Sequence, residues 1–336
     1  MSRTNQLPSI SARGVSRRGR DIAILAALFG LVLIGLIGIA AVTGWEETQA
    51  QLAILTWTQI GALLLLSLIN YGFRGIRWHL FARKLGLNTA FGQNMRHFIG
   101  GFAMSVTPGR VGELVRMRWL ARETGWTFER TAPLVLVDRA SDLAAMAVIL
   151  GVSVALSSSG IAGAIPVTAL ALVAAIIVTR PRLLAASALI GYRLSGLRPR
   201  IFARIRRAAR SLAMFSGPVT LVAAALIGAL GWFAEAYAFH LLLTWMGSDI
   251  GLAKASAIFI FATLAGGLTG APGGVGGAEA AMIGLLTLEG IPIETSLAAT
   301  AIIRITTLWF AIILGLVVFP FAERISLRTR NALEEN

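Results

Sequence analysis

The chain has 336 residues, of which 56% are hydrophobic and 14% are charged, and its mean hydropathy is +0.77. This composition is too apolar for a soluble domain, so it predicts an all-α polytopic membrane protein. The net charge of +14 comes from arginines between apolar runs, which is the positive-inside pattern of membrane proteins and argues against nucleic acid as a partner, and the absence of cysteine excludes disulfides and thiolate metal sites.

The basic segment 1–21 precedes an apolar run, Ile22–Thr43, that is longer than a signal-peptide core and has no convincing cleavage site. It predicts a first spanning helix that starts in the cytoplasm. A second predicted crossing, Ala53–Phe73, returns the chain to a basic cytoplasmic segment that contains Arg74 and Arg77.

The next apolar run, Phe91–Thr107, is short and has basic residues on both sides. A full crossing would place one basic end outside the cell, so we expect a re-entrant hairpin that enters from the cytoplasm. Proline and glycine interrupt helices, and they predict the break of this hairpin at Pro108, Gly109 and Gly112.

Two further crossings are predicted at Leu134–Leu156 and Ile161–Thr179, joined by a short outer turn. A basic cytoplasmic loop at 180–217 follows. Its apolar residues between Ile201 and Phe215 fall near helical spacing among arginines. This pattern is typical of an amphipathic helix on the anionic inner leaflet, although a plain loop that only sets the orientation fits equally well.

Pro218–Trp245 predicts a fifth crossing. The two apolar runs after it, Ala255–Leu268 and Val275–Leu288, are each too short to cross at about 20 residues per span. They predict a second hairpin, which enters from outside. Its break is predicted at Pro272, Gly273, Gly274 and Gly276.

Ser296–Phe319 is the sixth predicted crossing, and the arginines after it place the tail 322–336 in the cytoplasm, like the N-terminus. The expected location is the inner (plasma) membrane, and the predicted architecture is six spanning helices plus two re-entrant helical hairpins.

The two predicted breaks share the pattern Pro-Gly-x-Val-Gly. An arginine follows each proline at nearly the same distance (Arg139 and Arg304), and a tyrosine precedes each (Tyr71 and Tyr237). These matched positions predict an internal repeat within a membrane domain at 22–321, with halves at about 22–157 and 160–321. The halves are inverted because one starts inside and the other outside, and inverted repeats with broken helices place a substrate site near the midplane.

Charged side chains at membrane depth cost about 2.5–3.5 kcal/mol each at a helix centre, so they need a partner or an aqueous path. The residues predicted to bind substrate are Arg110, Glu113, Arg116, Arg139, Asp142, Glu279 and Arg304. Guanidinium groups match phosphate oxygens, and the carboxylates would balance the arginines or receive an amine. The alternatives are structural: a salt-bridge ladder of Arg110, Glu113 and Arg116, and an ion pair of Arg304 with Glu279.

Glu235 lies within the fifth crossing and is a candidate for a proton pathway, with a buried hydrogen-bonding role as the alternative. Asp138 and Asp142 are spaced i,i+4 and could hold Mg²⁺ as in membrane prenyl transferases, but the second half offers no matching acidic cluster. The chain has three histidines and no G-x-x-x-x-G-K-[ST] sequence. We therefore expect no metal, no cofactor and no ATPase activity.

The segments Pro108-Gly109-Arg110-Val111-Gly112-Glu113, Val137-Asp138-Arg139-Ala140-Ser141-Asp142-Leu143 and Ala271-Pro272-Gly273-Gly274-Val275-Gly276-Gly277-Ala278-Glu279, together with Arg304, carry a family resemblance. With them the chain resembles the membrane domain of lysylphosphatidylglycerol synthases, the flippase-like domain family, over about Ile22 to Phe321.

The resemblance implies a transporter of membrane lipids. The soluble aminoacyl transferase domain of bifunctional members does not follow this membrane part, so we expect no synthase activity and no catalytic residue. The lipid is left open among anionic or zwitterionic phospholipids, aminoacyl-lipids, glycolipids and polyprenyl-phosphate lipids, and so is the oligomeric state. The alternatives are a membrane-embedded transferase acting on a polyprenyl-phosphate lipid and a scaffold that recruits a lipid-modifying synthase through the loop 180–217.

Overall fold

The computed structural model describes residues 50, 54–105, 111–157, 164–195 and 209–334. Every regular element within these ranges is a helix, which confirms the all-α class. The helices long and apolar enough to cross a membrane are Trp57–Lys84, Phe128–Leu156, Pro218–Trp245 and Ile293–Ala332. A bent pair of helices at 168–190 would raise their number from four to five, so the count of six crossings stays a prediction. The predicted first crossing, Ile22–Thr43, lies outside the described residues.

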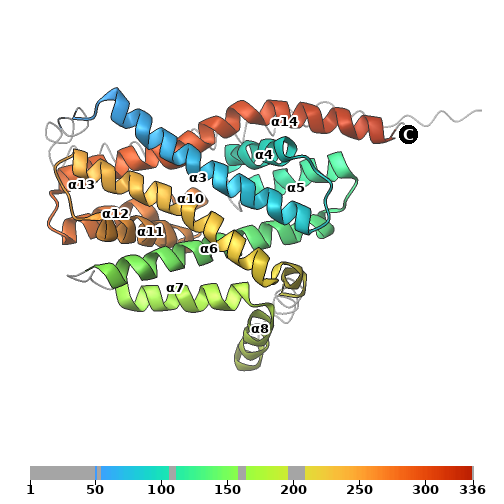
Figure 1. Ribbon diagram of the computed structural model, residues 1–336, viewed down its shortest axis with the longest axis horizontal. Coiled ribbons are helices and arrows are strands. Elements are labelled where there is room, and N and C mark those ends of the chain that lie inside the picture. The colour runs from blue at the N-terminus through green and yellow to red at the C-terminus, as the bar shows by residue number, and fades with distance from the viewer. Residues whose placement is uncertain (1–49, 51–53, 106–110, 158–163, 196–208, 335–336) are drawn as a thin grey trace, which may run out of the picture.

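Two long helices, α3 (Trp57–Lys84) and α10 (Pro218–Trp245), run side by side and antiparallel through the centre of the molecule (Figure 1). Each begins with a strong start signal. The side chain of Thr56 caps α3, and α10 has proline at its first position, where no backbone N–H is needed. Their outward side chains, such as Leu65 and Leu226, are exposed apolar groups, as contact with lipid requires.

The first pair of short helices consists of α4 (Phe91–Gly100) and α5 (Val111–Thr124). A 3-10 turn, η1 (Gly101–Met104), extends α4 toward the segment 106–110, which lies outside the described residues. A Cβ atom on Gly112 would lie 2.4 Å from the carbonyl oxygen of Gly101, so only glycine permits this close approach of the two backbones. At the other end of the pair, Glu123 of α5 lies 2.9 Å from Arg96 and 3.2 Å from His97 of α4.

The second pair of short helices consists of α11 (Leu252–Leu268) and α12 (Gly277–Leu288), which pack against each other. Between them the chain forms a 3-10 turn, η3 (Pro272–Gly274). Gly273, Gly274 and Gly276 all have positive φ, a conformation that strains other residues, so the glycines of this segment allow the helix to end and restart within a few residues. The two pairs lie at opposite ends of the long helices in Figure 1.

Three helices follow the first pair: α6 (Phe128–Leu156), α7 (Ala164–Thr179) and α8 (Pro181–Ser195). The chain bends by 107° between α7 and α8. Helix α6 begins before Leu134, the predicted start of the third crossing, and the predicted loop from residue 180 onward contains the helix α8. Proline is favoured at the first position of a helix, so Pro181 starts α8 directly after the bend.

The proposed amphipathic helix on the membrane surface falls partly outside the described residues. Its described end includes Leu212 and the short turn η2 (Ala213–Phe215). Leu212 and Phe215 are buried in the protein core, and the ring of Phe215 packs 5.5 Å from that of Phe81 on α3. This end of the segment therefore packs against protein rather than lying on a leaflet, which corrects the prediction for these residues.

The last long helix has three parts: α13 (Ile293–Arg304), a π-helical turn, η4 (Ile305–Trp309), and α14 (Phe310–Glu334). Helix α14 continues well beyond Phe319, the predicted end of the sixth crossing. Glu323 of α14 lies 2.8 Å from Arg122 and 2.9 Å from Arg118 of α5, so ion pairs stabilise the extension. The segment predicted as a tail is helical as far as Glu334.

The two largest clusters of buried apolar residues in the described structure each surround one pair of short helices. The first surrounds the α4–α5 pair and includes Trp78, Phe98 and Leu134. The second surrounds the α11–α12 pair and includes Phe239 and Ile258. Each pair of short helices therefore has its own core, and the polar side chains described below lie between the two.

The packing of α14 on η1 gives a testable prediction about stability. A Cβ atom on Gly315 would lie 2.2 Å from the backbone nitrogen of Ala103, whereas one on Gly61, in α3, would meet nothing within 4 Å. We expect Gly315→Ala to lower the free energy of unfolding by about 1–3 kcal/mol or more, because the backbone cannot move aside. The matched control Gly61→Ala should be neutral or slightly stabilising. Thermal unfolding in detergent measures both, and equal midpoints would contradict the close packing.

Candidate functional site

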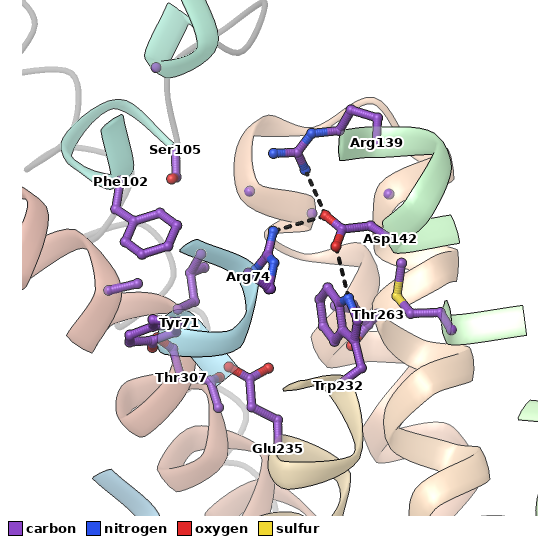
Figure 2. Close-up of a pocket in the computed structure, with 18 of the residues that line it drawn as sticks. Tyr71, Arg74, Phe102, Ser105, Arg139, Asp142, Trp232, Glu235, Thr263 and Thr307 are labelled. Carbon is purple, nitrogen blue, oxygen red and sulfur yellow. Dashed lines mark hydrogen bonds and ion pairs between the residues drawn. The ribbon is translucent and has the colours of Figure 1, made fainter. Parts of the chain in front are cut away.

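A cavity of about 380 Å³ lies between the two pairs of short helices. It is lined by residues of both interrupted regions, including Gly112 from the first and Gly273 and Gly274 from the second. The long helices α3, α6 and α10 supply about half of its polar lining residues, and Figure 2 shows several of these side chains. The cavity is therefore built where the interrupted helices meet the central bundle.

A buried cluster of arginines and aspartates forms one wall. Arg77, which is completely buried, lies 2.7 Å from Asp138 and 2.6 Å from Asp142. Asp142 also lies 2.9 Å from Arg74, and it accepts a hydrogen bond of 3.0 Å from the indole nitrogen of Trp232 (Figure 2). The arginines are one turn apart on α3 and the aspartates one turn apart on α6, so the two faces match.

The placement of Arg74 and Arg77 corrects the sequence prediction, which put both in a cytoplasmic segment. Helix α3 continues to Lys84, and this extension carries both arginines into the bundle. The sequence does contain a signal for this contact. Arg74 and Arg77 are spaced i,i+3, and Asp138 and Asp142 are spaced i,i+4, so each pair presents both of its charges on one helix face.

The same cluster bears on the alternative of a magnesium site at Asp138 and Asp142. Both carboxylates are neutralised by Arg77, and Asp142 has Arg74 and Trp232 as further partners. No group of three or more histidine, aspartate or glutamate side chains that could hold a metal ion occurs in the described part of the chain. The acidic pair therefore acts here as the counter-charge of buried arginines.

Two glutamate–arginine ion pairs occupy matching places beside the interrupted regions. Glu113 is in the first turn of α5 and lies 2.8 Å from Arg139 of α6. Glu279 is in the first turn of α12 and lies 2.5 Å from Arg304 at the end of α13. The second pair is the more buried one: the side chain of Arg304 is 10% exposed, against 35% for Arg139.

Arg304 also satisfies backbone groups that the interrupted helix leaves without partners. Its Nη2 donates a hydrogen bond of 3.1 Å to the carbonyl oxygen of Gly273. The second oxygen of Glu279 accepts a hydrogen bond of 2.7 Å from the backbone nitrogen of Gly276. Backbone groups freed inside a membrane need such partners, so the structural pairing weighed for Arg304 and Glu279 is present. Arg304 nevertheless lines the cavity.

Arg116 lines the cavity without a carboxylate partner. Among the described residues no acidic oxygen lies within 4 Å of it, and its Nε and Nη1 atoms are buried without a hydrogen bond. Its guanidinium lies 4.4 Å from the ring centroid of Phe98 and 5.5 Å from those of Trp78 and Phe102. Aromatic faces therefore hold this cation in place.

Glu235 of α10 is the corresponding anion. It is 5% exposed, and in the described ranges no cationic nitrogen lies within 4 Å of its carboxylate. Figure 2 shows this carboxylate directed into the space between Tyr71 and Trp232. The side chain of Asn70, which is completely buried, lies beside it.

Tyr71 and Tyr237, which the repeat places at equivalent positions, have different surroundings. Tyr71 lines the cavity and donates a hydrogen bond to the carbonyl oxygen of Thr307 in the π-helical turn. A π-helical turn shifts the backbone hydrogen bonding, and such turns are frequent at functional sites. Tyr237 is 37% exposed and does not line the cavity.

The structure brings together most of the residues predicted to bind substrate. Glu113, Arg116, Arg139, Asp142 and Arg304 line the cavity, and so does Glu235, the proton-pathway candidate. Glu279 contacts Arg304. Arg110, Pro108 and Gly109 lie outside the described residues. Sequence reasoning did not propose Arg74 or Trp232, which also line the cavity. Substrate binding by these residues stays a prediction.

Comparison with known proteins adds two findings. The family described as "Lysylphosphatidylglycerol synthase TM region" matches residues 23–315. A UPF0104 membrane protein of Methanothermobacter thermautotrophicus (strain Delta H) is 32% identical over 90 residues. Those residues are 27% of each chain, so this likeness covers only about a quarter of that relative.

Proposed function

This chain belongs to the family of lysylphosphatidylglycerol synthase TM regions, and from that premise we propose that it moves the headgroup of a membrane lipid through its central cavity. The observation that carries the proposal is the charged cavity itself, which lies between two apolar cores and is lined by four arginines, Arg74, Arg116, Arg139 and Arg304. A bilayer protein tolerates so many buried charges where they serve a polar substrate or path.

The chemistry of the cavity fits a lipid headgroup. Taking a phosphate through hydrocarbon is very costly because the charge loses its hydration. Arginines that offer paired N–H donors replace that hydration, and the volume of about 380 Å³ is in the range of small-molecule sites. The acyl chains would stay in the bilayer while the headgroup crosses.

The proposed architecture is two inverted halves with one re-entrant hairpin each, in six crossings. Three observations support it. The pairs α4–α5 and α11–α12 lie at opposite ends of the long helices (Figure 1), α3 and α10 are antiparallel, and the pairs Glu113–Arg139 and Glu279–Arg304 occupy matching positions. An inverted repeat requires this relation between equivalent elements.

The proposed orientation puts the α4–α5 end in the cytoplasm. Basic residues gather at this end of the molecule: Arg83 and Lys84 of α3, Arg118 and Arg122 of α5, and Arg328 and Arg330 of α14. Cytoplasmic segments of membrane proteins carry such an excess. Both termini would then be cytoplasmic, in the inner membrane.

A transferase and a scaffold remain the competing functions. The neutralised pair Asp138 and Asp142 offers little support for a metal-dependent transferase. Turnover of a polyprenyl-phosphate lipid that requires Mg²⁺, without movement of any lipid, would favour that alternative. Retention of lipid movement after removal of the loop 180–217 would argue against a scaffold that acts through this loop.

Filling the cavity tests the proposal. Thr263 of α11 lines the cavity, whereas Thr287 of α12 is exposed, and each hydroxyl donates a hydrogen bond to the carbonyl oxygen four residues earlier. The two threonines therefore differ mainly in whether they face the cavity.

In proteoliposomes with acyl-labelled phospholipids, we expect wild-type protein to make inner-leaflet label accessible to dithionite. Thr263→Trp should reduce this rate about tenfold or more because the bulky ring occupies the headgroup path. Thr287→Trp should keep it, and wild-type rates equal to those of protein-free vesicles would refute transport.

A further inference from the structure

We propose that the cavity selects zwitterionic headgroups, with Arg116 receiving the phosphate and Glu235 receiving a protonated primary amine. The inference rests on the transport function proposed above and names the substrate class of the same site. The observation behind it is that two charged residues of the described cavity wall, one positive and one negative, form no ion pair.

The charges of the described residues around the cavity balance. Ten charged residues of the described chain line it or form an ion pair with a residue that does: the arginines Arg74, Arg77, Arg116, Arg139 and Arg304, and the acids Glu113, Asp138, Asp142, Glu235 and Glu279. Five positive charges face five negative ones. A headgroup with a net charge would leave an uncompensated charge in a low-dielectric space, whereas a zwitterion would not.

All but two of these residues are paired with each other. The exceptions are Arg116 and Glu235, which have opposite charges, are 3% and 5% exposed, and line the same cavity. They form no ion pair with one another. Unpaired buried charges are costly, so a ligand that carries both complementary charges would relieve the cost at both sites at once.

Arg116 is better placed for the phosphate than the other arginines. Arg139 and Arg304 are already bound to glutamates, and Arg304 also holds the carbonyl oxygen of Gly273. Arg116 is held by aromatic rings instead, and its Nε and Nη1 atoms have no hydrogen-bond partner among the described residues. A phosphate oxygen can therefore bind Arg116 without breaking an existing ion pair.

Glu235 offers what an ammonium group needs. An ionised carboxylate only accepts hydrogen bonds, and the side chain of the buried Asn70 lies beside it. Tyr71 and Trp232 lie on either side of the carboxylate in Figure 2, and aromatic faces stabilise cations. A primary amine with three N–H donors fits this corner better than a quaternary amine, which has none.

The competing reading is that Glu235 stays protonated. The cavity would then carry one excess positive charge and prefer an anionic headgroup. Glutamine has the shape of a protonated glutamate, so Glu235→Gln separates the two readings. If the carboxyl is neutral, the substitution should leave the rate of lipid movement unchanged. If the carboxyl is charged, the substitution removes the partner of the ammonium group and should lower the rate.

The experiment compares three acyl-labelled lipids in proteoliposomes: phosphatidylethanolamine, which has a primary amine, phosphatidylcholine, whose amine has no N–H, and phosphatidylglycerol, which has no amine. Wild-type protein should move phosphatidylethanolamine fastest. Glu235→Gln should lower that rate about tenfold or more and leave phosphatidylglycerol unchanged or faster, since truncating one partner of a buried charge pair costs more than 1.4 kcal/mol. Arg116→Gln should slow all three lipids.

Glu129→Gln, on an exposed residue of α6, is the matched control and should change none of the rates. Gel filtration and thermal unfolding establish that each variant is folded. Phosphatidylglycerol moving faster than phosphatidylethanolamine, or Glu235→Gln affecting both lipids equally, would overturn the assignment while leaving transport intact. Movement of no lipid would instead refute the proposed function. Stabilisation by soluble phosphoethanolamine without lipid movement would assign the site to a free phosphate ester and so overturn the lipid substrate.

Discussion

Replacing Arg77 with alanine is expected to lower the free energy of unfolding by about 3–5 kcal/mol, which is a large part of the stability of an ordinary domain. Arg77 is fully buried and is the shared partner of Asp138 and Asp142. Removing it leaves carboxylates inside the bundle with less counter-charge. Thermal unfolding in detergent, followed by circular dichroism, measures the change.

Two comparisons sharpen this prediction. Arg118→Ala removes an arginine whose side chain is 47% exposed and whose partner is Glu323, and it should cost less than about 1 kcal/mol because water screens such pairs. Adding Asp138→Asn to Arg77→Ala should recover part of the loss, since it removes one uncompensated carboxylate. Equal effects of Arg77→Ala and Arg118→Ala would show that burial of the cluster does not matter for stability.

Replacing Arg304 with alanine is expected to abolish lipid movement. The change removes a cation from the cavity wall and leaves Glu279 and the carbonyl oxygen of Gly273 without their partner. A loss of about 2–5 kcal/mol corresponds to at least a 30-fold fall in rate. The dithionite assay on proteoliposomes measures it, with gel filtration as the test of folding.

The matched control is Lys254→Ala. Lys254 of α11 pairs with Glu289 at the far end of the same two helices, and neither residue lines the cavity. This variant also breaks an ion pair of the α11–α12 unit, so we expect a modest loss of stability and nearly normal transport. Unchanged transport in Arg304→Ala would remove Arg304 from the site.

The interruption between α11 and α12 was predictable because proline and glycine act locally. The helix ends and restarts around Gly273 and Gly276 whatever surrounds it, since other residues strain at positive φ. The charged residues of the cavity were predictable for a related reason. A charged side chain in an apolar run, such as that of Arg304, must face an ionic partner or an aqueous cavity. Neither inference required knowledge of which helices touch.

The extent of α3 was not predictable from the same rules. The positive-inside rule assigns arginines after an apolar run to a loop, and it placed Arg74 and Arg77 there. Their true position depends on Asp138 and Asp142, which lie more than 60 residues later and become neighbours only in the folded bundle. Charge compensation between distant helices is a tertiary effect, and it overrides the local signal.

The π-helical turn at Ile305–Trp309 makes the length of the last helix critical. Each residue of an α-helix advances the chain by about 100°, so deleting one residue from this turn would rotate everything after it by that angle. Glu323 would swing away from Arg122, and Gly315 would no longer face Ala103, although no side chain at either contact had changed. Single-residue deletions here should therefore be tolerated far less well than substitutions at the same positions.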